Sequence, residues 1–381
     1  MKRLVLAGVV MAALVAAGAA GAQAANSRVT GMGIQKQMGT LVSMPGGPPG
    51  VIAVVQRLGQ RSVYTAGVGN LQTGDRIRPT DHMRLASTAK AFSGAVALSL
   101  VRAGKLRLTD TVGKLLPKLP RAWRNVTLAQ ALRHTSGLPE LITGPGFLDY
   151  ARAHPHGTPS PSFVLSFVAK KPLDFRPGSR YHYSNTDNFV VAMMAQAATR
   201  RSYNQLLSSL VYKPLGLTQT SLPRGPALPR PFVHGYDTFP PPTEDVSTQL
   251  SAAYAWASGG LVSTPSELNK FIRGYAGGRL FGRAVQAQQM RFVAGNSEPI
   301  GPGVNSAGLG IFRYRTRCGT VYGHTGNIGG YTQFMAATRD GRRSVTVSAS
   351  AQITNGSPQP KRAAFAQLRR IYGDAVCLAL A

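Results

Sequence analysis

Acidic residues are scarce in this sequence. Only 14 Asp and Glu residues stand against 43 Lys and Arg residues, which gives a formal net charge of +29 at pH 7. The basic residues are scattered, and no basic run with interleaved aromatic residues is present. This distribution argues against nucleic-acid binding and favours a general attraction to polyanions such as cell-wall polymers. A solvated basic surface without a partner is the alternative.

Cysteine is almost absent, and no histidine cluster replaces it. Cys318 and Cys377 are the only two cysteines, and neither lies in a C-x-x-C redox or metal spacing. In an oxidising compartment such an isolated pair predicts one disulfide, with a catalytic thiol as the alternative. Among the seven histidines, His154-Pro155-His156 has no third or fourth ligand nearby. The sequence therefore predicts no metal site and no cofactor.

Long apolar runs are confined to the start of the chain. Lys2 and Arg3 precede an apolar run from Leu4 to Val15, and Ala22-Gln23-Ala24 forms a small-x-small cleavage site. This pattern is typical of a signal peptide over residues 1–24 and predicts an exported protein, either secreted or periplasmic. A retained membrane anchor is the alternative. No other apolar stretch is long enough to cross a bilayer.

Strand-like segments lie at both ends of the remaining chain, with a helical block between them. This order predicts a sheet completed by both termini, with an inserted all-helical subdomain. The expected single catalytic domain covers 25–381, with its α/β part at about 25–95 and 255–381 and the helical insert at about 96–254. Apolar periodicity and turn residues place strands at 51–55, 62–66, 308–316, 319–323, 331–338 and 343–350, and helices at 91–102, 126–132, 162–169, 189–199, 264–275 and 362–380.

Ser87-Thr88-Ala89-Lys90 is the first candidate for chemistry. A serine and a lysine three residues apart lie on the same face of a helix. If the lysine loses its proton on burial, it can accept the serine proton and leave a nucleophile. Ser87 would lie in the first turn of the helix, where free N–H groups favour developing negative charge.

Two further polar stretches strengthen this candidate. Tyr183-Ser184-Asn185 stands in a loop-like stretch after Pro177-Gly178, and a tyrosine beside a lysine can share its proton. His324-Thr325-Gly326 follows the strand expected at 319–323, where histidine and threonine can donate hydrogen bonds to a carboxylate. Taken alone, each stretch is also compatible with an ordinary turn or strand end.

Together the three stretches resemble the S-x-x-K, S-D-N and K-T-G set of penicillin-binding proteins and serine β-lactamases. The Y-S-N and H-T-G variants are similar to the branch that contains class C β-lactamases, serine esterases and the secreted D-alanyl-D-alanine carboxypeptidases of Streptomyces. The likeness is greatest to these carboxypeptidases and extends from about Gly50 to Cys377. It implies an α/β fold with an antiparallel sheet flanked by helices. Supporting stretches are 132–138, 175–178 and 259–264, with 318–326 and 340–346.

The resemblance also implies a role for each site residue. Ser87 would be the acylated nucleophile, Lys90 its proton acceptor, and Tyr183 the group that passes the proton to the leaving amine and later activates water. The backbone N–H of Ser87 and one near Asn327 to Gly329 would form the oxyanion hole. The substrate-binding residues would be Asn185, Tyr254, His324, Thr325 and Gly326, and the disulfide would join Cys318 to Cys377.

One position departs from the carboxypeptidase pattern. An arginine that binds the substrate carboxylate is expected on the strand before His324, but Phe312 stands there. Arg313 and Arg315 are close in sequence, yet strand alternation places them on the opposite face from Phe312. Recognition of a free C-terminal D-alanine therefore depends on Arg313, on Arg315, or on His324 and Thr325 alone.

The sequence thus predicts an exported serine hydrolase that acts through an acyl-enzyme. A D-alanyl-D-alanine carboxypeptidase is the leading interpretation, and a β-lactamase or an esterase of the same fold is the alternative. A catalytically silent cell-wall-binding protein is the rival outside the enzymes, but it would not need Ser87, Lys90, Tyr183 or His324. The expected partners are peptidoglycan stem peptides or other small acyl substrates, with β-lactams as inhibitors or substrates and anionic cell-wall polymers as a surface partner.

Overall fold

The structure is a computed structural model, and it describes residues 29–381. The signal peptide predicted at 1–24 lies outside the described residues. Eight strands form one sheet in the order β2-β1-β12-β11-β10-β9-β8-β7, and every neighbouring pair is antiparallel. The strands are β1 (Gly50–Arg57), β2 (Gln60–Gly67), β7 (Val293–Ala294), β8 (Val304–Ala307), β9 (Phe312–Thr316), β10 (Gly319–Ile328), β11 (Tyr331–Ala337) and β12 (Arg343–Ala349).

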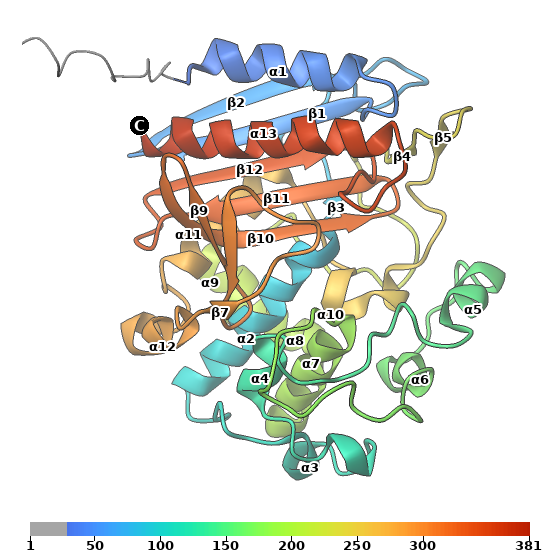
Figure 1. The fold of residues 1–381 in the computed structure, drawn as a ribbon, viewed down its shortest axis with the longest axis vertical. Coiled ribbons are helices and arrows are strands. Elements are labelled where there is room, and N and C mark those ends of the chain that lie inside the picture. The colour runs from blue at the N-terminus through green and yellow to red at the C-terminus, as the bar shows by residue number, and fades with distance from the viewer. Residues whose placement is uncertain (1–28) are drawn as a thin grey trace, which may run out of the picture.

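Helices cover both faces of this sheet (Figure 1). On one face lie α1 (Gly31–Ser43) and α13 (Lys361–Leu380), which pack on each other and on the first and last strands of the chain. On the other face lies α11 (Pro265–Ala276), which contacts β1, β11 and β12. Thr264 caps α11, because its side chain accepts a hydrogen bond from Glu267 N at 3.2 Å. Both faces are buried, so β1 can be apolar at Val51, Ile52, Ala53, Val54 and Val55 without interruption.

A helical block packs below the sheet and surrounds the long helix α2 (Figure 1). Residues 89–100 of α2 are buried on all sides, which explains why this helix has no polar face. The other helices are α3 (Val112–Leu115), α4 (Leu128–Leu132), α5 (Phe147–Ala153), α6 (Pro161–Ser166), α7 (Asn185–Thr199), α8 (Tyr203–Leu207), α9 (Lys213–Leu215), α10 (Trp256–Gly259) and α12 (Gly282–Gln289). Small two-stranded sheets join β3 (Met83–Arg84) to β6 (Val262–Ser263) and β4 (Tyr236–Asp237) to β5 (Glu244–Asp245).

The structure confirms the predicted fold class, an antiparallel sheet completed by both termini and flanked by helices. Two local predictions were wrong, and one helix was missed. His324-Thr325-Gly326 lies inside β10 rather than after it, because the strand continues in register with β11 as far as Ile328. Asn185 begins α7 instead of lying in a loop. The helix α1 was not predicted at all. Within residues 29–381 no helix is both long and apolar enough to cross a membrane.

The predicted disulfide joins Cys318 to Cys377. Cys318 lies in the turn that precedes β10, and Cys377 lies in the last turns of α13. The bond therefore ties the terminal helix to the strand that carries His324, Thr325 and Gly326. The two cysteines are 59 residues apart, a separation for which the chain-entropy model gives about 4 kcal/mol of stabilisation.

We expect the Cys318→Ser/Cys377→Ser double variant to lose up to about 4 kcal/mol of unfolding free energy in a denaturant titration, because its unfolded chain is no longer cross-linked. Its reaction with active-site reagents should change little at temperatures where it stays folded, since both cysteines lie away from Ser87. Two free thiols in the native protein prepared without reductant would contradict the disulfide.

Candidate active site

Ser87 lies in a 3₁₀ turn, Ala86–Thr88, immediately before α2. The chain enters this turn from β3, which pairs with β6, and Leu85 N donates to Leu261 O at 2.9 Å. On the other side, the side chain of Gln333 on β11 donates to Arg84 O at 3.0 Å. The nucleophile candidate is thus held between the sheet and the helical block.

The backbone around Ser87 contains three non-glycine residues in the left-handed region. Ala86 has φ of 50°, His134 of 57° and Trp256 of 31°. Such a conformation costs of the order of 1–3 kcal/mol at each residue and persists only where the surroundings impose it. Ala86 precedes the serine, and Trp256 begins the short helix α10 that faces it. Ala86 and Trp256 therefore place strained backbone beside the candidate nucleophile.

Lys90 is fully buried one turn after Ser87 and makes three hydrogen bonds. Its Nζ lies 3.0 Å from Ser87 Oγ, 2.6 Å from Asn185 Oδ1 and 2.8 Å from the Ser258 carbonyl oxygen. A neutral amine has two N–H bonds and one lone pair. With Asn185 and Ser258 accepting the two N–H groups, the lone pair is left to face the Ser87 hydroxyl.

Burial lowers the pKa of Lys90 from 10.5 to about 7, although Glu140, Glu298 and Asp187 act in the opposite direction. A large fraction of the lysine is therefore uncharged near neutral pH, as a proton acceptor must be. The three acids keep the amine from losing its proton at much lower pH. Lys90 combines the position and the basicity predicted for it.

Tyr183 lies against Lys90, whose Nζ is 4.9 Å from the centre of the tyrosine ring. Among the described residues no group forms a hydrogen bond with its buried hydroxyl oxygen. Burial raises the pKa of Tyr183 well above 10, while the Ser87 hydroxyl lowers it. Tyr183 is consequently a neutral phenol that can donate a proton, and Lys90 is the stronger candidate for the base.

Asn185 connects Lys90 to an acid that sequence reasoning missed. Its Oδ1 accepts from Lys90, and its Nδ2 donates to Glu140 Oε1 at 2.8 Å. Glu140 Oε2 also accepts from Asn185 N at 2.6 Å, at the start of α7. This bidentate contact fixes the asparagine amide, and one N–H of Nδ2 remains for a substrate. No sequence motif marks Glu140, which follows the 132–138 stretch and meets Asn185 only in the fold.

The strand β10 passes directly beside Ser87. A side chain on Gly326 would place its Cβ 2.7 Å from Ser87 N and 2.8 Å from Thr88 N, so only glycine permits this approach. Asn327 and Ile328 follow and line the same cavity as Ser87. An oxyanion hole formed by the N–H groups of Ser87 and Asn327, as the resemblance implies, stays a prediction.

His324 and Thr325 are buried. The Thr325 hydroxyl donates to Pro299 O, and His324 Nδ1 lies 2.5 Å from Thr325 O. Burial lowers the pKa of His324 to about 3, so its imidazole is neutral. Phe312 packs edge-on against this imidazole with 4.9 Å between ring centres. Neither His324 nor Thr325 lines the cavity, so their predicted contact with a carboxylate stays a prediction.

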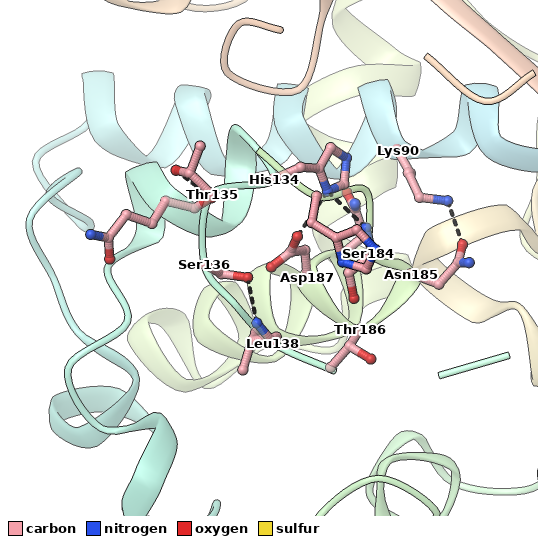
Figure 2. Close-up of polar contacts among 12 residues, drawn as sticks. Lys90, His134, Thr135, Ser136, Leu138, Ser184, Asn185, Thr186 and Asp187 are labelled. Atoms are coloured by element: carbon pink, nitrogen blue, oxygen red, sulfur yellow. Dashed lines mark hydrogen bonds and ion pairs between the residues drawn. The ribbon is translucent and has the colours of Figure 1, made fainter. Parts of the chain in front are cut away.

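His134 and Asp187 form a second buried pair at the start of α7 (Figure 2). His134 Nδ1 lies 2.8 Å from Asp187 Oδ2, and the imidazole packs on the Tyr183 ring with 4.5 Å between centres. Burial lowers the pKa of His134 to about 3 and raises the pKa of Asp187 well above its usual value. Because Asp187 is two residues after Asn185, this pair also fixes the start of α7. The sequence marked His134 only as part of a resembling stretch.

The reaction cavity has a volume of about 270 Å³ and opens at Ser87. Its polar lining is formed by Ser87, Tyr183, Asn185, Ser258, Glu298 and Asn327, and the predicted Tyr254 lies in its wall. The rest of the lining is mainly apolar and comes from Leu141, Ile142, Phe147, Leu148, Ala151, Leu250 and Ile328. Such a cavity suits a small acyl group with an apolar side chain.

The strand before His324 offers no cation to this cavity. Phe312 is buried in the core below His324. Arg313 is turned away, donates to Ser306 Oγ at 3.1 Å and stacks on Phe292, while Arg315 is exposed on the same side of β9. The alternation predicted for these residues agrees with the structure, and none of them lines the cavity.

Comparison with known proteins gives one family and several relatives. The description of the β-lactamase family matches residues 34–369. Protein flp of Staphylococcus aureus is 27% identical over 196 residues, which is 49% of this chain but only 38% of that relative. The chain thus matches well under half of the length of this relative. The D-alanyl-D-alanine-carboxypeptidase/endopeptidase AmpH of Escherichia coli is 25% identical over 75% of each chain.

Among solved structures, a D-stereospecific amidohydrolase from Streptomyces sp. is similar over 84% of this chain and 94% of its own. The TM-score is 0.73 and the sequence identity 29%.

We expect acylation of Ser87 by a fluorophosphonate to become faster as pH rises and to level off above about pH 7, because only the neutral form of Lys90 accepts the serine proton. Below that pH the rate should fall roughly tenfold per pH unit. Peptide mapping should place the adduct on Ser87. Ser136→Ala and Ser184→Ala serve as controls and should still be labelled, whereas a rate that continues to rise beyond pH 9 would assign a lysine with an ordinary pKa.

The His134→Ala variant should react with the same reagent roughly 10- to 100-fold more slowly, because Tyr183 loses the ring on which it packs and a displacement of about 1 Å is costly at a reacting centre. His156→Ala is the matched control, since His156 is exposed. A thermal unfolding curve shows whether the variant is folded at the assay temperature. Equal rates for a folded His134→Ala variant and the native protein would show that the imidazole does not position Tyr183.

Proposed function

The chain belongs to the β-lactamase family, and from this premise we propose that it is a serine amidohydrolase that forms an acyl-enzyme on Ser87 and releases an uncharged or cationic leaving group. This choice of leaving group rests on the residues that line the reaction cavity. Among the described residues it contains no arginine or lysine that could bind a substrate carboxylate. A carboxypeptidase must desolvate and pair that carboxylate, which favours a cation.

Acylation uses the contacts of Lys90. As Ser87 Oγ attacks the substrate carbonyl carbon, its proton passes to Lys90 Nζ over the 3.0 Å hydrogen bond. The bond from oxygen to carbon forms, and the carbonyl oxygen gains negative charge that the N–H groups of Ser87 and Asn327 stabilise. Asn185 holds both the lysine and the substrate amide, because one N–H of its side chain remains free.

Release of the leaving group and deacylation require a proton donor. Tyr183 is a neutral phenol without a partner in the described structure, and it donates its proton to the leaving nitrogen as the carbon–nitrogen bond breaks. The proton held by Lys90 then restores the phenol. In deacylation the same groups accept a proton from water as its oxygen attacks the ester carbon, and they return this proton to Ser87 Oγ as the bond from carbon to Oγ breaks.

The acyl part of the substrate is small and apolar in this proposal. The cavity volume of about 270 Å³ and the side chains of Leu141, Phe147 and Tyr254 suit one amino-acid residue with an apolar side chain. The likeness to a D-stereospecific amidohydrolase, at 29% identity over 84% of this chain, supports amides of D-amino acids as the substrate class.

A D-alanyl-D-alanine carboxypeptidase is the second candidate. It is supported by the likeness to AmpH over 75% of both chains and by His324 and Thr325 on β10. It would require these two residues to turn toward the substrate, or Arg313 or Arg315 to reach the cavity. β-Lactams and cell-wall peptides remain predicted ligands of the same serine, a β-lactamase or esterase activity remains an alternative outcome, and export and association with anionic polymers remain predictions.

The deciding experiment compares a D-alanyl-D-alanine peptide as the free acid with its C-terminal amide. We expect the native protein to hydrolyse the amide at least about tenfold faster, because a carboxylate finds no cation in the cavity. Arg313→Ala and Arg315→Ala should keep this preference, and Ser87→Ala should abolish both reactions.

A strong preference for the free acid, with a loss of roughly 2–5 kcal/mol of transition-state stabilisation in one arginine variant, would instead establish the carboxypeptidase. Incubation with a labelled penicillin followed by mass spectrometry separates the remaining alternatives. A stable adduct on Ser87 indicates a penicillin-binding peptidase, a transient adduct a β-lactamase, and no adduct an esterase or amidase.

A further inference from the structure

Glu298 is the only acidic side chain that lines the reaction cavity among the described residues. It lies in the segment between β7 and β8, far in sequence from the residues of the catalytic motifs. Only 14 acidic residues occur in a chain with a net charge of +29, and one of them lines the same cavity as Ser87. No part of the proposed acyl transfer uses this carboxylate.

A second carboxylate adds to the negative potential of this cavity. Glu140 lies behind Asn185 and reaches it through two hydrogen bonds. Both Glu140 and Glu298 interact electrostatically with Lys90, and each raises the pKa of this lysine. When Lys90 is neutral, as acylation requires, Glu298 in the cavity lining and Glu140 behind Asn185 have no compensating cation among the residues that line the cavity.

The hydroxyl of Tyr183 indicates that the reaction cavity binds a polar ligand. Its hydroxyl is buried, lines the cavity and has no hydrogen-bond partner within residues 29–381. A buried hydroxyl without a partner costs on the order of 1–3 kcal/mol. A polar group of a bound substrate can satisfy this hydroxyl, and Glu298 lines the same cavity.

Glu298 is also linked to strand β10 through its neighbour in the sequence, Pro299. The carbonyl of the adjacent Pro299 accepts the hydrogen bond of the Thr325 hydroxyl. In a carboxypeptidase of the resembling branch, Thr325 would contact the substrate carboxylate. In this structure the Thr325 hydroxyl already donates to Pro299 O. The residue before Pro299 is the anion Glu298, whose charge is opposite to the one that a carboxylate needs.

We propose that Glu298, with Glu140 behind it, forms an acidic subsite that binds the protonated primary amine of the substrate and excludes carboxylates. The substrate class is then the amides of amino acids whose α-amine is free, with an apolar side chain in the remainder of the cavity. This inference rests on the proposed amidohydrolase function and specifies its substrate.

The test measures binding separately from turnover. Two ligands are compared by calorimetry with the Ser87→Ala protein at about pH 6.5, where an α-amine is still protonated. These ligands are D-phenylalanine amide and D-phenyllactamide, which differ only in an ammonium group in place of a hydroxyl. We expect the ammonium ligand to bind at least about tenfold more tightly, a ratio typical of one charge-assisted contact.

Glu298→Gln in the same background should bring the two affinities within about twofold of each other, and Glu298→Lys should make the hydroxyl ligand the tighter one. Glu244→Gln is the matched control, because Glu244 is exposed on the hairpin of β4 and β5. This change should leave the ratio as it is in the Ser87→Ala protein.

Equal affinities in the Ser87→Ala protein, no binding of either ligand, or an unchanged ratio in Glu298→Gln would each overturn the acidic subsite. The first two results need no change at residue 298, so they decide the matter even if the Glu298 variants do not fold. Failure of the proposed function looks different. In that case the native protein hydrolyses neither amide, while the Ser87→Ala protein still prefers the ammonium ligand.

Discussion

The burial of Lys90 is the constraint on which the rest of the site depends. An ammonium group without solvent is expensive unless it is hydrogen-bonded or becomes neutral. Here both remedies operate, because Asn185 and Ser258 accept its N–H groups while burial lowers the pKa to about 7. Removal of any neighbour would change the charge of the lysine as well as its position. The hydrogen bonds that hold the site together are thus the same ones that make Lys90 a base.

The residues of the site come from two parts of the fold. The sheet brings β10 and its bare Gly326 against the Ser87 turn, and the helical block supplies Lys90, Tyr183 and Asn185. Ala86 and Trp256 adopt left-handed backbone conformations on either side of the serine. Strain of this kind persists where two well-packed parts meet and each prevents the other from relaxing. Ser87 therefore lies at the interface between the two parts, where packing from both sides fixes its position.

The features that sequence reasoning found are those that depend on local geometry. Ser87 and Lys90 are one helical turn apart, and the alternation of Phe312 with Arg313 follows from strand geometry alone. Glu140, Glu298 and the pair of His134 with Asp187 could not be found in this way, because each acts on a residue that is distant in sequence. The end of β10 was misplaced because its last residues are held in the strand by pairing with β11. The helix α1 contains three glycines and has only three buried residues, so its apolar pattern is weak.

The order of the strands also determines when this protein can fold. In the sheet β1 pairs with β12, so that Val51 lies opposite Ala349, and α1 packs on α13. Contacts between segments so far apart in sequence form slowly, since a long loop must close before they are made. A ribosome must therefore release nearly the whole chain before the hairpin of β1 and β2 can join the rest of the sheet. During synthesis the N-terminal segment stays without its sheet, which is the state that a translocation channel for unfolded chains accepts.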